Sequence, residues 1–443
     1  MLRLKSIEIQ DFRAIEHAKV PLDRYLTVLV GENAAGKTAI LDAIAAALSP
    51  IIDGGQPRLS KSVEPKDFRV TGLADPMGEV VRERHMSLSV ETEDGGWQCQ
   101  FLLDDNPRRQ TVRIETRGIA KYPYREQLSE DDVVVPIIAS YGADRATPPR
   151  RTANSAAHAK RLAGSLGRVG GYVGALESRA VYDEAVEWFE AIENLELRSN
   201  REAAGSYRDR RLDAVRHAVS KLVPELGNLR MVGLPPRMML DAKLPGRPPE
   251  SLSVDQLSGG YRAMLALVID LARRMADLNP DVSDPLRVPG VVLIDEIDLH
   301  LHPKWQQLVV SSLRQMFPEV QFILSTHSPQ VLTTIEPHNI LNLKWRNGHL
   351  IEEDVPSTSG AESGRLMSEV MGVEERPPAE VSEFVRLLEE YRSLVAKGQW
   401  DSKKACALIE QMRTESPDDP VLGALDLERR RLAAQKRRET GEA

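Results

Sequence analysis

The stretch Gly31-Glu32-Asn33-Ala34-Ala35-Gly36-Lys37-Thr38 decides the fold of this chain. It matches the pattern G-x-x-x-x-G-K-[ST] in full. An apolar run at 25–30 precedes it, and residues of helical composition at 39–48 follow it and end at Ser49-Pro50. A phosphate-binding loop needs this strand–loop–helix context, because the N–H groups of the loop and of the helix start face phosphate oxygens. The sequence therefore predicts an α/β P-loop fold that binds a nucleoside triphosphate.

The residue types within this loop predict individual roles. Lys37 is expected to act in catalysis by neutralising charge on the β- and γ-phosphates, and Thr38 to offer its hydroxyl to Mg²⁺. The dipole of the following helix adds to the attraction for phosphate. The predicted nucleotide-binding residues of the loop are Gly31, Glu32, Asn33, Ala34, Ala35, Gly36, Lys37, Thr38 and Ala39.

Two further strand ends carry polar residues. The apolar run Val291–Ile294 is followed by Asp295 and Glu296. Asp295 is predicted to hold Mg²⁺, directly or through water, and Glu296 to polarise the attacking water as the general base. A second apolar strand, 320–325, leads to His327, which is predicted to hydrogen-bond the γ-phosphate or the attacking water. The alternative for His327 is a structural histidine at a strand end.

A second glycine-containing segment, Leu257-Ser258-Gly259-Gly260-Tyr261, opens a predicted helix over 261–275. Such a segment forms an anion nest at a helix N-terminus, where Ser258 can cap the helix and donate to phosphate. Ser258, Gly259 and Gly260 are therefore predicted to bind nucleotide. The nucleotide-binding site is predicted to be completed by another subunit. Alone, Ser-Gly-Gly also marks ordinary linkers.

Strands that alternate with helices predict a parallel-rich sheet, preceded by antiparallel strands near the N-terminus. Four segments are expected: an N-terminal lobe (1–149), a mostly helical insertion (150–250), a C-terminal lobe (251–357) and a C-terminal helical region (358–443). Residues 235–249 are proline-rich and are interpreted as a breaker zone.

Bulk properties limit the classes of protein to consider. The chain has 443 residues, a net charge of −8 and two cysteines, Cys99 and Cys406, which indicate reduced thiols rather than a disulfide framework. No apolar run approaches the ~20 residues of a membrane span, so a soluble cytoplasmic protein without a membrane partner is expected. Because the net charge is negative, nucleic-acid binding would need a local basic patch. Clustered basic residues could form such a patch, or they could lie on a solvated helical face. The basic clusters are Arg145, Arg150, Arg151, Lys160, Arg161 and Arg168, then Arg198, Arg201, Arg208, Arg210 and Arg211.

The two glycine segments, Asp295–Glu296 and His327 together resemble the ATP-binding-cassette ATPases. The opening 4–13 (Leu-Lys-Ser-Ile-Glu-Ile-Gln-Asp-Phe-Arg) is similar to the RecF/SMC/OLD branch, and Asp298–Pro303 resembles the D-loop of OLD-like ATPases. Within that branch, three segments resemble the ATPase of Septu antiphage systems, which also occurs beside some retrons. These segments are 140–145, Trp188–Phe189 and 364–373.

The resemblance implies an ATPase head that forms a head-to-tail homodimer around ATP and Mg²⁺. Lys37, Thr38, Asp295 and Glu296 of one subunit would face Ser258 and Gly260 of the other. It further implies that the ATPase regulates a partner nuclease of the HNH type, with the helices from Glu380 onward as the partner surface. Higher oligomers and a nucleic-acid ligand are left open.

Two alternatives to this function remain at the level of sequence. One is a RecF-like ATPase of DNA repair or replication, and the other is a transporter ATPase subunit. The antiparallel opening strands, the insertion and the 298–303 segment argue against the transporter. The chain also departs from the cassette pattern, because 141–145 lacks the usual glutamine, whose role Asp144 or Arg145 is expected to take, and Tyr261 stands where glutamine is usual.

Overall fold

The computed structural model divides the chain into two compact units, Met1–Met371 and Gly372–Ala443, which are considered separately. The described residues are 2–53, 63–72, 80–104, 111–122, 124–130, 133–143, 167–177, 182–202, 207–243, 246–346, 349–374 and 376–440. Within them, no helix combines the length and the apolar character that crossing a bilayer requires.

A six-stranded sheet forms the centre of the first unit, with the strand order β14-β13-β3-β12-β11-β7. All neighbours in it are parallel except β13 and β14, and the central strands are buried along their whole length, as expected for a sheet covered on both faces. The strands are β3 (Leu26–Val30), β7 (Ile137–Tyr141), β11 (Gly290–Ile294), β12 (Val320–Ser325), β13 (Ile340–Arg346) and β14 (His349–Glu353). The carboxyl ends of β3, β11 and β12 therefore meet at one edge, where polar side chains can gather.

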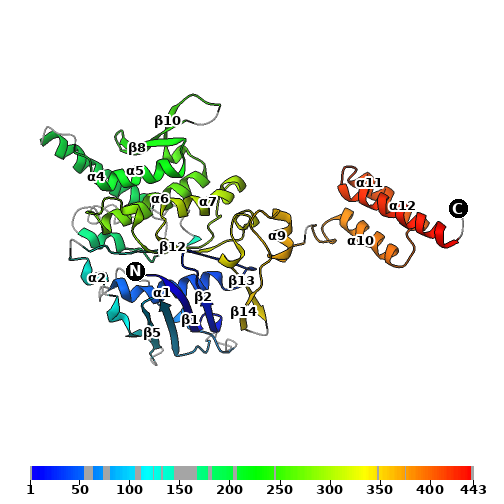
Figure 1. Cartoon of the computed structure of the whole chain (residues 1–443), viewed down its shortest axis with the longest axis horizontal. Helices are drawn as coiled ribbons and strands as arrows, with labels where there is room; N and C mark the ends of the chain where they lie inside the picture. The colour runs from blue at the N-terminus through cyan, green and yellow to red at the C-terminus, as the bar shows by residue number, and fades with distance from the viewer. Residues whose placement is uncertain are drawn as a thin grey trace. The chain divides into compact units, whose positions relative to one another are not determined.

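A five-stranded antiparallel sheet packs on the opposite side of the first helix, with the order β2-β1-β4-β5-β6. Its strands are β1 (Leu4–Phe12), β2 (Ile15–Pro21), β4 (His85–Thr92), β5 (Gly95–Leu103) and β6 (Val112–Arg117). Helix α1 (Lys37–Asp53) contacts strands of both sheets and lies between them (Figure 1). The predicted α/β fold with a parallel-rich sheet and N-terminal antiparallel strands is confirmed.

Helix α1 runs through Pro50, so the predicted stop at Ser49-Pro50 is wrong. Proline in a helix interior removes one backbone hydrogen bond and costs about 3 kcal/mol. Burial offsets this cost, since Leu48, Ile51 and Ile52 are at most 3% exposed. The Ser49 hydroxyl also donates to the carbonyl of Ala45 at 3.1 Å, within the turn that the proline disrupts.

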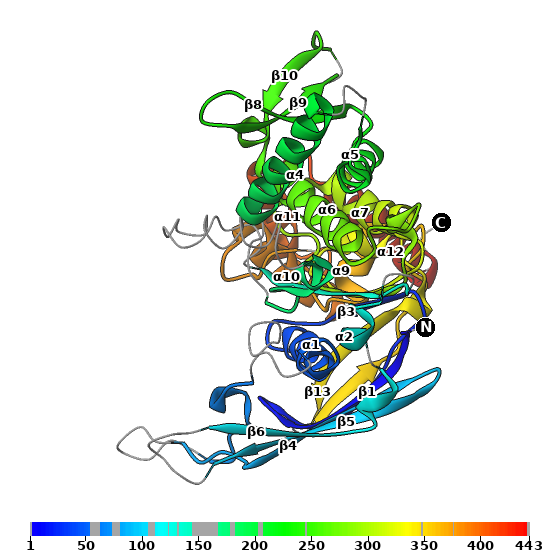
Figure 2. The ribbon, with the colours of Figure 1, turned by 90° about the vertical axis from the view of Figure 1, so that its left-hand side faces the viewer.

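Helices cover the other face of the six-stranded sheet (Figure 2). The long helices are α4 (Tyr182–Glu202), α5 (Arg210–Leu222), α6 (Gly259–Leu278) and α7 (Pro303–Met316), and the short ones are α2 (Tyr124–Gln127), α8 (Pro329–Leu332) and α9 (Ser363–Glu369). The short helix α2 contacts α1 instead. A small antiparallel sheet packs on the far side of α4 and α5. It has the order β10-β9-β8, with β8 (Leu226–Val232), β9 (Arg237–Ala242) and β10 (Glu250–Ser253). Strand β9 lies inside the zone 235–249, where the proline-rich sequence had indicated a breaker.

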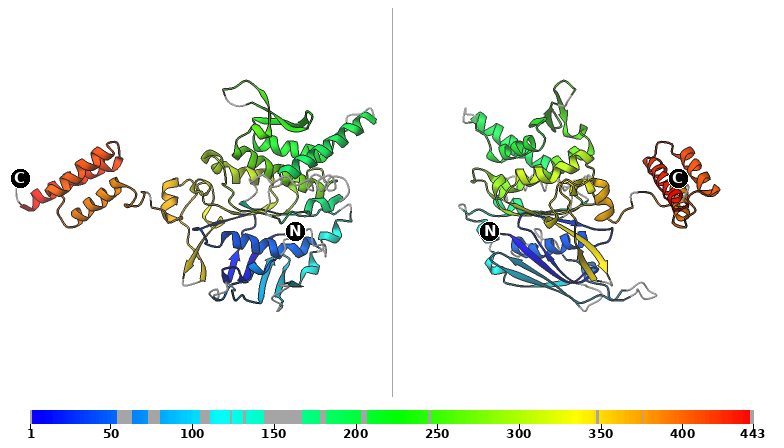
Figure 3. Two further views of the ribbon diagram at one scale, coloured as in Figure 1. Left: turned by 180° about the vertical axis from the view of Figure 1, so that it is seen from behind. Right: turned by 45° about the vertical axis from the view of Figure 1, so that its right-hand side comes forward.

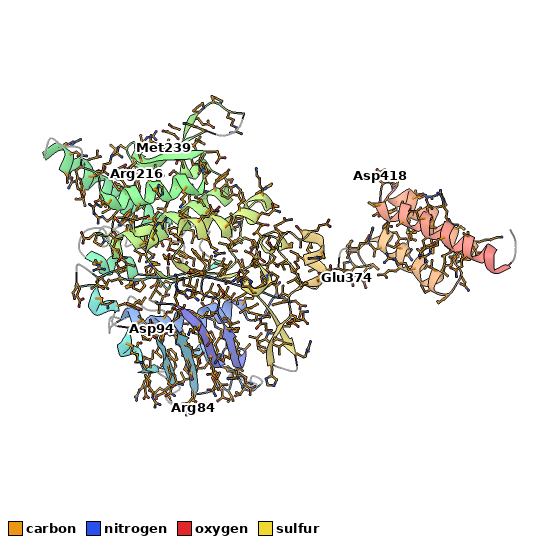
Figure 4. All side chains as sticks on the ribbon, in the orientation of Figure 1. Arg84, Asp94, Arg216, Met239, Glu374 and Asp418 are labelled. Atoms are coloured by element: carbon orange, nitrogen blue, oxygen red, sulfur yellow. The ribbon has the colours of Figure 1, made fainter. Side chains whose placement is uncertain are left out.

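Helices α4 and α5 are joined by ion pairs rather than by apolar contact alone. Arg216 on α5 (labelled in Figure 4) pairs with Glu193 and Glu196 on α4 at 3.0 and 3.4 Å. Arg211 pairs with Asp209 at 2.7 Å. Arg211 and Arg216 therefore stabilise the packing of this helical region through ion pairs.

The second unit contains three helices, α10 (Glu383–Ala396), α11 (Lys403–Glu415) and α12 (Pro420–Thr440), packed side by side (Figure 3). They share a small core of their own around Leu388, Tyr391 and Met412. Two serines begin helices, because Ser382 accepts from the N–H of Val385 and Ser402 from that of Ala405. The helices expected over 380–397, 402–413 and 421–438 are confirmed to within a few residues.

Candidate functional site

The phosphate loop joins β3 to α1 and has a backbone that only small residues tolerate. Gly31 has φ +147°, and a Cβ at that position would lie 2.4 Å from the carbonyl oxygen of Leu343 on β13. Gly36 has φ +94°, and Ala34 has φ +65° although it is not glycine. The Trp345 ring N–H on β13 donates to the Ala34 carbonyl at 3.0 Å. Strand β13 therefore braces the loop in the shape that its glycines permit.

Lys37 is the cation within this loop. Its ammonium group donates to the carbonyl oxygens of Gly31 and Glu32 at 2.7 and 2.8 Å, and the residue is 6% exposed. Burial lowers the pKa of Lys37, whereas the nearby carboxylates of Asp295, Glu296 and Asp298 oppose that shift. A phosphate entering the loop can replace the two carbonyl contacts with stronger charge-assisted ones.

Thr38, the next residue, lies directly against the acidic end of β11. Its hydroxyl donates to Oδ2 of Asp295 at 2.8 Å. A hydroxyl and one carboxylate are hard oxygen donors, and Mg²⁺ is usually held by one or two carboxylates together with phosphate oxygens. Thr38 and Asp295 thus have the chemistry and the proximity that a magnesium ion on a triphosphate requires.

Ser325, the last residue of β12, holds the two acidic residues in place. Its hydroxyl donates to Oδ1 of Asp295 and accepts from the backbone N–H of Glu296 at 2.8 Å. Glu296 has φ +49°, a conformation that is uncommon and costly for a non-glycine residue. Sequence reasoning missed Ser325; the available signal was its place at the end of a buried strand, two residues before His327.

A cavity of about 390 Å³ brings the predicted groups together. It is lined by Arg13 and by Asn33 to Ala39 of the phosphate loop, with Asp295, Glu296 and His327 on the acidic side. Both the backbone N–H of His327 and the hydroxyl of Thr326 donate to Oδ1 of Asp298, at 3.3 and 2.5 Å. The ends of β3, β11 and β12 therefore converge on one space, as their parallel arrangement requires.

Ser258, Gly259 and Gly260 lie elsewhere, and the described lining of that cavity does not include them. Ser258 is the exposed N-cap residue of α6, and its side chain makes no capping hydrogen bond. A Cβ on Gly260 would lie 2.6 Å from the carbonyl oxygen of His300. Glycine at 260 thus allows α6 to approach the segment 298–303, and the Tyr261 ring meets Trp305 edge-on at 5.4 Å.

Tyr141, at the end of β7, links the acidic strand end to helix α6. Its carbonyl accepts from the N–H of Asp295 at 2.8 Å, and its hydroxyl donates to Oδ2 of Asp270 at 2.9 Å. Asp270 is fully buried and pairs with Arg273 and with Arg274, the latter at 2.7 Å. Tyr141 also lines a second cavity of about 230 Å³ with Thr38 and Asp295. Sequence reasoning missed this network, because arginines three and four residues after an aspartate are typical of exposed helices.

The expected replacements for the glutamine, Asp144 and Arg145, lie outside the described residues, as do Arg150, Arg151, Lys160 and Arg161 of the first basic cluster. Arg168 of that cluster is 8% exposed. It donates to the backbone carbonyls of Leu278, Glu130 and Val133. Arg168 therefore acts in packing.

The Ser325→Ala variant is expected to lower ATP turnover by about 10–100-fold, the usual cost of losing a group that orients catalytic residues. It removes the contact to Asp295 and leaves the N–H of Glu296 without its acceptor. Steady-state phosphate release measures the effect. Ser311→Ala is the control, since that exposed hydroxyl donates to a carbonyl of its own helix; equal activity of the two variants would contradict the assignment.

Comparison with known proteins adds family information. Residues 6–146 match a family described as "AAA domain", and residues 174–333 match one described as "AAA domain, putative AbiEii toxin, Type IV TA system". The Retron Vc95 probable ATPase of Vibrio cholerae is 26% identical, over 91% of this chain and 85% of that protein. The Retron Ec83 probable ATPase of Escherichia coli is 39% identical, over 50% of this chain and 40% of that protein.

The Septu protein PtuA of Bacillus mycoides is 35% identical over 28% of this chain and 18% of its own length. Among solved structures, an SMC head bound to the winged-helix domain of ScpA aligns over 80% of this chain with a TM-score of 0.46 and 15% identity. The SMC head domain from Thermotoga maritima aligns over the same share with a TM-score of 0.42. In sequence the chain is thus similar to the retron probable ATPases and to Septu PtuA, and two of its segments match AAA domain families.

Proposed function

We propose that this chain hydrolyses ATP and that its nucleotide state regulates a partner effector nuclease in antiphage defence. The observation that carries the ATPase part is the meeting of Lys37 and Thr38 with Asp295, Glu296 and His327 at one cavity. Relatives named as retron probable ATPases and as Septu PtuA support the defence context.

Each side chain has a distinct task in the proposed reaction. Lys37 leaves its two carbonyl acceptors and neutralises charge on the β- and γ-phosphates. Glu296 takes a proton from the water that attacks the γ-phosphorus, while its backbone is held by Ser325. His327 hydrogen-bonds the γ-phosphate or the attacking water from the neighbouring strand end. Mg²⁺, held by Thr38 and Asp295, would supply further neutralisation of phosphate charge.

The complete site is proposed to need two copies of the chain arranged head to tail. Ser258 has an exposed hydroxyl at the N-terminus of α6 and lies outside the lining of its own chain's cavity. Helix N-termini bind phosphate through free N–H groups and the helix dipole. Ser258 to Gly260 of a second copy would therefore contact the nucleotide from the side opposite Lys37 and complete the binding site.

The output of the ATPase is proposed to be an HNH-type nuclease bound through the helices from Glu380 onward. Supporting this is the arrangement of α10 to α12 as a compact unit with its own core. The RecF-like alternative predicts instead an ATPase stimulated by DNA, with binding that weakens steeply as salt rises.

Two assays on the full chain test the proposal. Phosphate release with ATP and Mg²⁺ is expected from the unmodified protein and is expected to be lost in Lys37→Ala, whereas turnover unaffected by that change would contradict the ATPase site. Affinity purification of the native complex is expected to recover an HNH nuclease. Absence of a nuclease together with DNA-stimulated turnover would favour the repair function.

A further inference from the structure

Cys406 in the second unit has a surrounding that its packing alone does not explain. The thiol is half-buried on α11, and the Nη2 atom of Arg429 on α12 donates to its sulfur at 3.2 Å. Sulfur is a weak hydrogen-bond acceptor. The contact with the thiol therefore replaces only poorly the hydrogen bonds to water that the guanidinium group loses.

Two hydrogen-bond donors beside this thiol have no partner among the described residues. The hydroxyl of Tyr391 on α10 is buried without an acceptor, although the residue is 0% exposed, and the buried Nε of Arg429 also lacks one. Tyr391 interacts electrostatically with both Arg429 and Cys406, so the three side chains lie near one another. A buried donor left unsatisfied is costly, and such a group calls for a ligand to explain it.

An acceptor oxygen bonded to the sulfur would offer both donors a partner. We propose that Cys406 is a site of reversible oxidation to the sulfenic acid, whose added oxygen accepts hydrogen bonds from Tyr391 Oη and Arg429 Nε. A hydroperoxide is the oxidant: the sulfur attacks one peroxide oxygen, an S–O bond forms and the O–O bond breaks. The sulfur loses two electrons, the thiol proton passes to the departing oxygen, and with hydrogen peroxide as the oxidant that oxygen leaves as water.

The surroundings suit this product at each position. Burial raises the pKa of Tyr391, even though Arg429 opposes the shift, so the phenol stays protonated as a donor. The positive charge of Arg429 favours the sulfenate anion. Partial exposure of Cys406 admits a small oxidant, which is a requirement for a modifiable cysteine.

The same chain contains an internal control. Cys99 on β5 is 0% exposed, and burial raises the pKa of its thiol to about 12, so its reactive thiolate form is scarce at neutral pH. Unspecific oxidation would modify both cysteines, whereas the proposal predicts oxidation of Cys406 alone.

The test treats the full chain with hydrogen peroxide in the presence of dimedone, which traps sulfenic acids, and locates adducts by peptide mass spectrometry. We expect an adduct on Cys406 and none on Cys99. Tyr391→Phe and Arg429→Gln are each expected to lower the adduct yield several-fold. Tyr391→Phe removes only a hydroxyl for which the described part of the chain offers no partner, so it keeps the apolar packing of its helix unit.

Arg430→Gln is the matched control, because it removes the same charge one residue away on an exposed position; its adduct yield is expected to stay at the level of the unmodified chain. Circular dichroism of each variant verifies that the helices persist. Equal labelling of Cys99 and Cys406, direct passage to sulfinic acid without a trapped adduct, or undiminished yield in Tyr391→Phe would overturn the proposal. ATPase activity is not the readout, so the result is independent of the nucleotide site.

Discussion

The Glu296→Gln variant is expected to bind ATP with Mg²⁺ and to lose turnover by about 10²–10⁴-fold, the contribution of a positioned general base. Glutamine keeps the shape of the side chain but cannot take a proton from water. The backbone contact from Glu296 to Ser325 survives the change, because it uses the main-chain N–H. The variant should therefore retain nucleotide binding while it loses turnover, and the ATP-bound assembly should persist.

Two measurements on this variant establish the separation. Phosphate release gives the turnover, and sedimentation with ATP compared to ADP gives the assembly state. Glu336→Gln is the control, since that carboxylate is exposed and outside the described lining of the cavity. Turnover in Glu296→Gln at the level of the control would remove Glu296 from the role of base.

The Asp270→Asn variant is expected to destabilise the first unit by about 3–5 kcal/mol, the cost of breaking a buried ion pair by removing one partner. Burial alone would raise the pKa of Asp270, but the facing guanidiniums of Arg274 and Arg273 outweigh it and hold the pKa below its ordinary value. Asparagine would leave both buried arginines without the carboxylate that accepts their hydrogen bonds. Denaturant unfolding followed by circular dichroism measures the change.

The neighbouring Asp277 provides a control of opposite sign. Burial raises its pKa to about 6, against the attraction of Arg273 and Arg211. A raised carboxyl pKa means that the folded state binds the proton more tightly than the unfolded state, so stability falls as pH rises from about 4 to about 6. Asp277→Asn should abolish that fall and be neutral or stabilising at pH 7. Asp270 acts the other way, since its stabilisation is full above the ordinary aspartate pKa and is lost as pH falls below it.

The phosphate loop and the acidic strand end could be predicted from the sequence because each is a local pattern. Gly31 to Thr38 carries its strand and helix on either side, and Val291 to Ile294 signals burial through four apolar residues in a row. Parallel strands bring their carboxyl ends to one edge, so the meeting of Thr38 with Asp295 follows from the two patterns together.

The features that the sequence did not predict depend on contacts between distant segments. Ser325 and Tyr141 look like ordinary strand residues, and only the sheet order places them beside Asp295. Strand β9 forms within a proline-rich zone because β8 and β10 supply its partners on both sides. Pro50 stays helical because two sheets enclose α1. In each case tertiary packing outweighs the local preference.

The central claim is that one chain supplies Lys37 and a second supplies Ser258 to the same ATP. Mixing two inactive variants, Lys37→Ala and Ser258→Arg, tests it most directly. In the mixed dimer one of the two composite sites contains both intact residues, so partial phosphate release is predicted, while each variant alone stays inactive. No recovery of activity, with subunit exchange demonstrated by labelled chains, would contradict a shared site.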